Sequence, residues 1–214
     1  MKGLYLYSLW VRIWHWLNAL SCVILLLSGM SLHFSNRHDP IVSFDTSMIV
    51  HNIAGIAMAL LYVVFLIGNI ISSNGVHYKV KIKGYINRLI KQVIYYGVGI
   101  FKGEPHPFPA TQTCKFNPMQ QVAYVGVMYG LVSALVLSGV MLLFPESIPD
   151  NLFGAGTILP IALAHTLLSY FLALFLIGHL YLATTGHTPL SNYKTMITGV
   201  HLEHQTDELE GTAK

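Results

Sequence analysis

Four histidines lie inside the long apolar stretches of this 214-residue chain, and imidazole is a side chain that can bind a metal ion. His165 and His179 are fourteen residues apart on one uncharged stretch. On an α-helix this spacing returns the second side chain to within about 40° of the first and places it ~21 Å further along the axis. Two imidazoles so far apart cannot share one ion, but each can hold a separate cofactor.

The apolar stretches that carry these histidines are long enough to cross a membrane. The chain is 54% hydrophobic and only 10% charged, which is too few charges for a soluble surface of this size. A spanning helix needs about 20 predominantly apolar residues. We therefore predict an all-α integral membrane protein, a bundle of four spanning helices near residues 9–32, 47–71, 119–143 and 159–184.

The segment 72–118 between the second and third spans contains a further helical pattern. Apolar residues recur at helical spacing between Ile86 and Gly97, with basic residues interleaved, which predicts an amphipathic helix at the membrane surface. We assign residues 1–202 to the membrane domain and residues 203–214 to a polar C-terminal tail.

The basic residues predict the orientation of the chain. With four spans, both termini and the segment 72–118 lie on one side, and the connections 33–46 and 144–158 lie on the other. Of the 12 Lys and Arg residues, only Arg37 falls on the second side. Because basic residues concentrate in cytoplasmic segments, we expect a multi-pass inner-membrane protein with both termini in the cytoplasm.

Depth within the predicted spans sorts the histidines into two pairs. His15 and His179 lie near the cytoplasmic face, and His51 and His165 lie near the outer face. A structural zinc usually takes four ligands, whereas two imidazoles fill both axial positions of a haem iron. Hydrogen-bonded packing is the alternative for any single histidine, but ionisable residues inside spans are rare and usually functional. The sequence therefore predicts two haem b groups that transfer electrons, because neither iron keeps an open position for oxygen.

Several small residues and one arginine could support these cofactors. The small residues that could leave room for a porphyrin are Gly29, Gly55, Gly126, Gly130 and Gly139, although ordinary contact between helices explains them equally well. Arg12 lies one helical turn before His15, where it could pair with haem propionates or extend to lipid phosphates.

Several segments of the chain resemble a known family, the bacterial di-haem cytochrome b subunits of nickel–iron hydrogenases, formate dehydrogenases and thiosulfate reductases. The resemblance covers nearly the whole chain and lies in VRIWHWLNAL, HNIAG, KFNPMQQVAY and the spaced histidines of the fourth span. GIFKGEPHPFP and TGHTPLSNYKTMITG are most similar to the thiosulfate-reductase-type branch. The resemblance implies that two b haems are ligated by His15 with His179 and by His51 with His165.

The resemblance also implies partners on both sides of an electron-transfer path. Electrons would pass between a periplasmic iron–sulfur or multihaem subunit, with its catalytic subunit, and menaquinone or ubiquinone in the membrane. The quinone would lie beside the cytoplasmic haem, at Asn117 and Gln120. A capping role competes with this interpretation, because Asn117 is a good N-cap and Gln120 completes a capping box.

Two other functions stay open at this point. A stand-alone di-haem cytochrome b that oxidises quinol or superoxide would share the four spans and the histidine placement, although such proteins tend to lack a segment as long as 72–118. A haem-free membrane anchor or transporter is the second alternative. No nickel ligand, molybdenum ligand or catalytic nucleophile is recognisable, so we expect a subunit of an oxidoreductase complex rather than an enzyme for the terminal substrate. We expect membrane lipid as a partner and no nucleic acid.

Overall fold

The structure is a computed structural model, and it describes residues 2–34, 42–109, 111, 114–149, 156–186 and 188–203. The chain separates into two compact units. The helical unit consists of Ile13–Ile71 and Gly126–Gly178. The terminal unit consists of Met1–Arg12, Ser72–Val125 and His179–Lys214.

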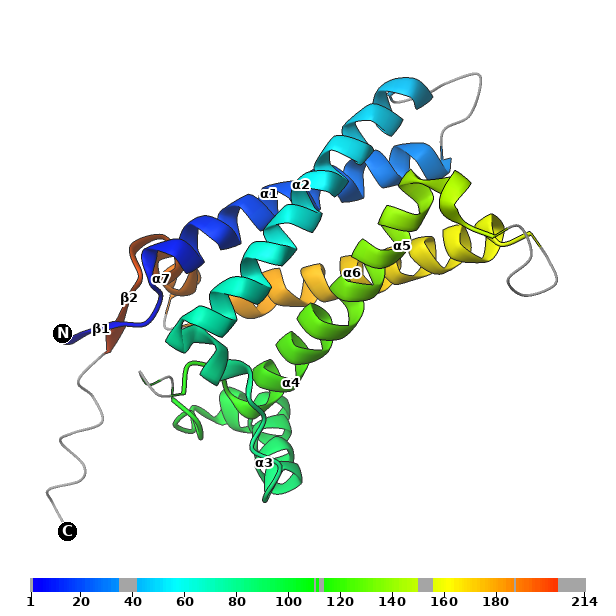
Figure 1. The fold of residues 1–214 in the computed structure, drawn as a ribbon. Helices are drawn as coiled ribbons and strands as arrows, with labels where there is room; N and C mark the ends of the chain where they lie inside the picture. Colours follow the sequence, from blue (N-terminus) through cyan, green and yellow to red (C-terminus); the bar gives the residue numbers. More distant parts are fainter. Residues whose placement is uncertain are drawn as a thin grey trace, which may run out of the picture. The chain divides into compact units, whose positions relative to one another are not determined.

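Within the described ranges, four helical segments are long and apolar enough to cross a membrane, as the sequence predicts. They are α1 (Leu9–Phe34), α2 (Phe44–Ile71), the segment Pro118–Leu143, and α6 (Ile158–Ala183) (Figure 1). Their bounds agree with the predicted spans to within three residues at each end. The fold is therefore an all-α membrane bundle.

The third span is one continuous helical segment with an irregular turn in its middle. It runs from α4 (Pro118–Gly126) through the π-helical turn η3 (Val127–Leu131) into α5 (Val132–Leu143), and the short helix η4 (Pro145–Ser147) follows. The hydroxyl of Ser133 lies 3.0 Å from the Tyr129 carbonyl oxygen at the end of this turn. The same hydroxyl lies 2.5 Å from the Tyr62 hydroxyl of α2, which packs against α5.

Replacing Tyr62 with phenylalanine should weaken the contact between α2 and α5. The variant loses one hydrogen bond between spans, and such bonds contribute about 0.6 kcal/mol on average and about 1.7 kcal/mol at most. We expect a lower midpoint of thermal unfolding in detergent, with the haem spectrum retained. Tyr181→Phe is the control, because Tyr181 is 67% exposed. Equal midpoints for the two variants would show that this hydrogen bond does not stabilise the bundle.

Aromatic side chains form the best-buried core of the helical unit. Phe65 of α2 is only 1% exposed, and its ring stacks on Trp14 of α1 at a centroid distance of 5.0 Å. The indole Nε1 of Trp14 donates to the Leu61 carbonyl at 2.8 Å, so the polar end of this apolar side chain is satisfied. Tyr129 closes the cluster from the third span, 5.6 Å from Phe65. These contacts hold α1, α2 and the third span together.

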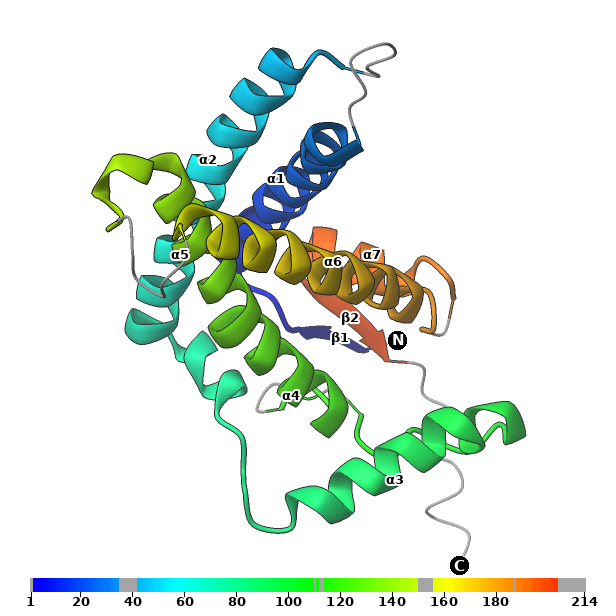
Figure 2. The ribbon, with the colours of Figure 1, turned by 90° about the vertical axis from the view of Figure 1, so that its right-hand side faces the viewer.

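The terminal unit contains three elements that were not predicted from the sequence, two strands and a helix. The strands β1 (Lys2–Tyr5) and β2 (Val200–Glu203) pair antiparallel, with Lys2 opposite Glu203 (Figure 2). The helix α7 (Ser191–Thr198) precedes β2. Four-residue strands show too little alternation to be recognised when the partner strand is almost the whole chain away. Glu203 thus belongs to a strand rather than to the predicted tail, and residues 204–214 lie outside the described ranges.

Gly199 makes the turn between α7 and β2 possible. Its φ is +83°, a left-handed conformation that favours glycine at a helix C-terminus. A Cβ atom at this position would lie 2.6 Å from the Tyr7 carbonyl oxygen. The Gly199 carbonyl in turn accepts hydrogen bonds from the backbone N–H groups of Leu6 and Tyr7 at 2.8 and 3.3 Å.

The helix predicted in the segment 72–118 is α3 (Tyr85–Gly97), which lies between two short 3₁₀ helices, η1 (Ser73–Tyr78) and η2 (Gly99–Lys102). The side chains of Ile86, Ile90 and Ile94 on its apolar face are exposed, whereas Gln92 is fully buried. An apolar face turned outward suits a helix at a membrane surface.

Candidate cofactor site

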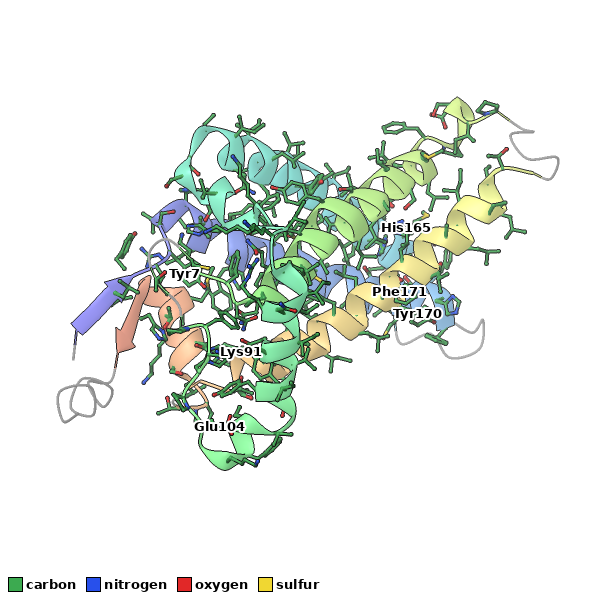
Figure 3. The ribbon with its side chains drawn as sticks, turned by 90° about the horizontal axis from the view of Figure 1, so that it is seen from below. Tyr7, Lys91, Glu104, His165, Tyr170 and Phe171 are labelled. Atoms are coloured by element: carbon green, nitrogen blue, oxygen red, sulfur yellow. The ribbon has the colours of Figure 1, made fainter. Side chains whose placement is uncertain are left out.

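His51 of α2 and His165 of α6 face each other inside the helical unit. Their ring centroids are 6.4 Å apart and the ring planes meet at 77°; Figure 3 shows His165 along α6 with Tyr170 and Phe171. A metal ion ligated by two imidazoles needs bonds of about 2.0–2.1 Å to each nitrogen, and each nitrogen lies about 1 Å from its ring centre, which together require ~6 Å between the centres. The observed separation therefore fits one metal ion between the two rings.

A serine on a neighbouring helix orients the His51 ring. The Ser28 hydroxyl of α1 lies 3.0 Å from His51 Nδ1 and donates its own proton to the Ile24 carbonyl at 2.7 Å. Because that proton is already used, the serine oxygen accepts a hydrogen bond from the His51 Nδ1–H group. The His51 ring then carries its free lone pair on Nε2.

The same arrangement occurs at His165. The Ser138 hydroxyl of α5 lies 2.8 Å from His165 Nδ1 and donates to the Ala134 carbonyl at 2.7 Å. His165 is thus also protonated on Nδ1 and keeps the lone pair on Nε2, the form in which imidazole binds a metal ion. The two histidines thus have the same kind of hydrogen-bond partner at Nδ1.

The glycine after each serine gives the imidazole ring its room. A Cβ atom on Gly29 would lie 3.4 Å from His51 Cε1, and one on Gly139 would lie 3.3 Å from His165 Cε1. The sequence analysis considered these glycines as space for a porphyrin or as ordinary helix contacts. In the structure each of these two glycines lies against a histidine ring of a neighbouring helix, so the glycine lets the two helices approach closely, and the porphyrin role stays a prediction.

The donor set suits a haem iron better than a structural metal ion. The described residues contain no group of three or more His, Cys, Asp or Glu side chains that could hold a metal ion. Zinc sites usually need four such ligands, whereas a haem supplies four nitrogens of its own and needs only two axial side chains. His51 and His165 could therefore hold one haem between them.

The other two histidines lie in different units of the structure. His15 is on α1 in the helical unit, where its ring meets Trp16 edge to face at 5.2 Å. His179 is on α6 in the terminal unit, and its ring lies 6.2 Å from Tyr124 of α4. The pairing of His15 with His179 stays a prediction.

Arg12 has a structural contact within the terminal unit. Its guanidinium Nη1 donates to the carbonyl oxygen of Ile197 at 2.6 Å. This hydrogen bond joins the start of α1 to the last turn of α7. The predicted pairing of Arg12 with haem propionates stays a prediction.

Asn117 and Gln120 form the capping box that the sequence suggested. The Asn117 side-chain oxygen accepts from the Gln120 backbone N–H at 2.8 Å, and the Gln120 side-chain oxygen accepts from the Asn117 backbone N–H at 3.2 Å. The capping role is therefore confirmed, and the quinone role stays a prediction.

A buried polar cluster lies beside this capping box, formed by Gln92, Tyr96 and Asn117. The Asn117 amide nitrogen donates to the Tyr96 hydroxyl at 3.0 Å, and Asn117 is only 5% exposed. Burial raises the pKa of Tyr96, while its interactions with the side chains of Asn117 and Gln92 oppose that shift. Tyr96 is thus a neutral hydroxyl that can donate or accept a hydrogen bond.

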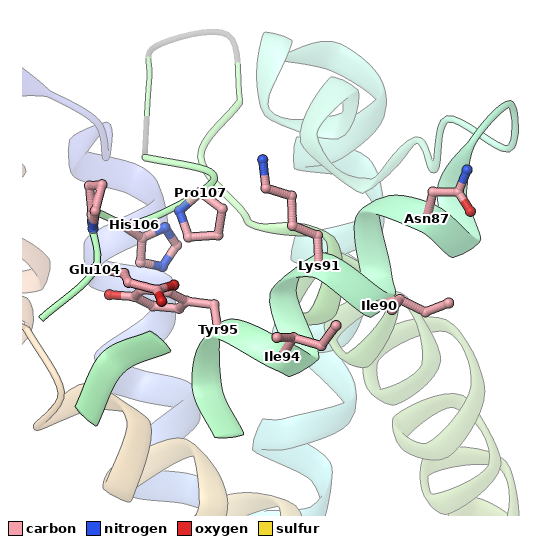
Figure 4. A pocket seen from close by; sticks show the side chains of 9 residues that line it. Asn87, Ile90, Lys91, Ile94, Tyr95, Glu104, His106 and Pro107 are labelled. Atoms are coloured by element: carbon pink, nitrogen blue, oxygen red, sulfur yellow. The ribbon is translucent and has the colours of Figure 1, made fainter. Parts of the chain in front are cut away.

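Neither of the two best-defined cavities in the described ranges is lined by any of the four histidines. One, of about 660 Å³, lies between α3 and residues 104–107, where the ring centroids of Tyr95 and His106 are 4.9 Å apart and the ring planes are tilted by 59° (Figure 4). The other, of about 500 Å³, is an apolar groove between α1 and α2. The cofactor site is therefore separate from both.

Comparison with known proteins identifies the family. The model of a family described as prokaryotic cytochrome b561, of the nickel–iron hydrogenase cytochrome b type, matches residues 6–199. The chain belongs to this family. It is also 43% identical over 200 residues to the protein named "Putative cytochrome YdhU" of Escherichia coli (strain K12). The aligned region covers 94% of this chain and 75% of that protein. As a cytochrome b561-type protein, the chain is a membrane haem protein that transfers electrons.

Family membership decides against one of the alternative functions considered from the sequence. A haem-free anchor or transporter does not agree with a cytochrome b561-type protein, whereas both electron-transfer functions do. The sequence analysis missed Ser28 and Ser138. The available signal was the tripeptide Leu-Ser-Gly, which occurs at residues 27–29 and again at residues 137–139.

Proposed function

We propose that the chain is the membrane-embedded di-haem b subunit of a respiratory complex. It would move electrons between an iron–sulfur or multihaem partner on the periplasmic side and quinone near the cytoplasmic side. The observation that carries this proposal is the His51/His165 pair, whose 6.4 Å separation and Nδ1 hydrogen bonds suit two axial ligands of one haem.

The second haem of this proposal would be held by His15 and His179. His179 shares the continuous helix α6 with His165, so one helix would supply a ligand to each haem. Helical geometry then separates the two ligand positions by ~21 Å along the axis.

The chain's own residues set the conditions for electron transfer. Haem b held by these histidines would supply reversible one-electron chemistry, and ligation by His51 with His165 would favour electron transfer over oxygen chemistry. The apolar helices keep water away from the ligands, and Ser28 and Ser138 hold the outer pair of imidazoles in one tautomer.

The quinone would bind at the polar cluster in the terminal unit. The Tyr96 hydroxyl accepts a hydrogen bond from Asn117 and can donate its own proton to a quinone oxygen. Aromatic rings connect the cluster to a predicted haem ligand, because Phe116 next to Asn117 contacts Tyr124 at 4.9 Å and Tyr124 lies 6.2 Å from His179. These contacts favour quinone exchange beside the cytoplasmic haem.

Orientation and partners follow from the charge distribution. Almost all Lys and Arg residues lie on the side of the termini and of the segment 72–118, which the positive-inside rule places in the cytoplasm of a bacterial cell. The opposite face, near His51 and His165, would receive the periplasmic partner. The sequence resemblance favours a partner of the thiosulfate-reductase type.

Tyr96→Phe tests the quinone site. Losing one hydrogen bond of about 0.5–1.5 kcal/mol should slow haem reduction by a menaquinol analogue by up to roughly tenfold. The haem spectrum should not change. Tyr95→Phe is the matched control, because the ring of this neighbouring tyrosine makes a tilted contact with His106 that the change leaves in place. Equal reduction rates for both variants in stopped-flow measurements would exclude Tyr96 from the site.

The proposed function as a whole is tested with the purified wild-type protein. We expect a dithionite-reduced spectrum with low-spin b-haem bands at about two haems per chain, since four histidines supply two axial pairs. Purification in mild detergent should retain a redox partner. A protein with one haem or none contradicts the di-haem assignment, whereas a di-haem protein that oxidises quinol without a partner supports the stand-alone alternative.

A further inference from the structure

We propose that Ser28 and Ser138 are positioning residues that set the reduction potential of the haem held by His51 and His165. This inference rests on the proposed ligation by that pair. Each serine sits on a helix that supplies no ligand to this haem, and each contacts the ring nitrogen that faces away from the metal position.

The direction of the two hydrogen bonds is determined by the helices themselves. Each serine oxygen has one proton, and in each case that proton goes to a carbonyl four residues earlier, Ile24 for Ser28 and Ala134 for Ser138, both at 2.7 Å. The serine oxygen can then only accept from the histidine.

The glycine that follows each serine makes these hydrogen bonds short. With no Cβ at Gly29 or Gly139, the imidazole lies directly on the helix surface, 3.4 or 3.3 Å from where that atom would be. The repeated Leu-Ser-Gly sequence thus forms one device, used once on α1 for His51 and once on α5 for His165. The serine determines which ring nitrogen of the histidine carries the proton, and the glycine lets the imidazole ring lie close to the helix.

The consequence for the haem follows from ligand basicity. A histidine that donates its second ring N–H becomes a more basic ligand, and a more basic ligand stabilises the oxidised iron. Both axial ligands of this haem have such an acceptor. Removing either acceptor should therefore raise the midpoint potential of this haem, and removing both should raise it further. Each single variant keeps the serine on the other histidine, so each single change should be partial.

The experiment is a spectroelectrochemical titration of the full-length protein in detergent. We expect Ser28→Ala and Ser138→Ala to raise the potential of the same haem component and to shift its low-spin electron paramagnetic resonance signal. Thr at either position keeps the hydroxyl and should restore the wild-type values. Ser133→Ala is the matched control, because Ser133 lies on the same span but contacts Tyr62 rather than a histidine.

Each result has a defined meaning. Unchanged potentials in both alanine variants with haem retained would overturn the proposal, as would shifts in two different haem components. Loss of haem that threonine restores supports the positioning role, and loss that threonine does not restore contradicts it. If His165→Ala leaves the haem spectrum unchanged, the assignment of His165 as a ligand fails. If His165→Ala removes one haem but Ser28→Ala and Ser138→Ala keep the wild-type potentials, only the serine proposal fails.

Discussion

Replacing His165 with alanine should remove one of the two proposed b haems from the purified protein, because the change deletes one proposed axial ligand and the methyl group offers no substitute. We expect the haem content to fall from about two to about one per chain. The remaining component should keep its spectrum, since its predicted ligands, His15 and His179, are untouched. Haem extraction and reduced-minus-oxidised spectra measure the effect.

Two comparisons make this prediction specific. His51→Ala should remove the same spectral component as His165→Ala, because the two rings face each other at 6.4 Å. His33→Ala is the control, since this histidine of α1 contacts Phe34 and Tyr170 edge to face and is not a predicted ligand. If His165→Ala and His15→Ala removed the same component, the pairing would be wrong.

Replacing Gly139 with valine should disrupt the same haem without touching a ligand. A Cβ atom at this position would already lie 3.3 Å from His165 Cε1, and valine adds two methyl groups to it. The ring cannot keep both its contact with Ser138 and its place opposite His51. We expect most of this haem to be lost, with the other component retained, as measured by the same spectra.

Two controls vary the size of the side chain at position 139 and the side of the helix that is changed. Gly139→Ala should have a smaller effect, because the ring needs to move by only a few tenths of an ångström to restore ordinary contact. Leu137→Val changes a side chain that is 66% exposed on the same helix, and should leave both haems in place. A Gly139→Val protein with two unperturbed haems would show that the space beside His165 is not needed.

The sequence alone was sufficient to predict the four spans, the amphipathic helix α3 and the capping box, while the haem ligands that it indicates stay a prediction. Hydropathy and helical period are local properties, so the four spans and the amphipathic α3 were predicted to within a few residues. The fourteen-residue spacing of His165 and His179 is equally local, because a single helix determines it. The capping box at Asn117 was also readable, since it involves positions three residues apart.

Only the tertiary structure revealed which side chains form hydrogen bonds to His51 and His165. The hydrogen bond from His51 to Ser28 joins residues 23 apart, and the one from His165 to Ser138 joins residues 27 apart, each across two helices. Such contacts depend on how each helix is rotated about its axis and where it crosses its neighbour, and no local pattern encodes either quantity. The pairing of β1 with β2 is the extreme case, because four-residue strands at opposite ends of the chain become stable only after the fold has brought them together.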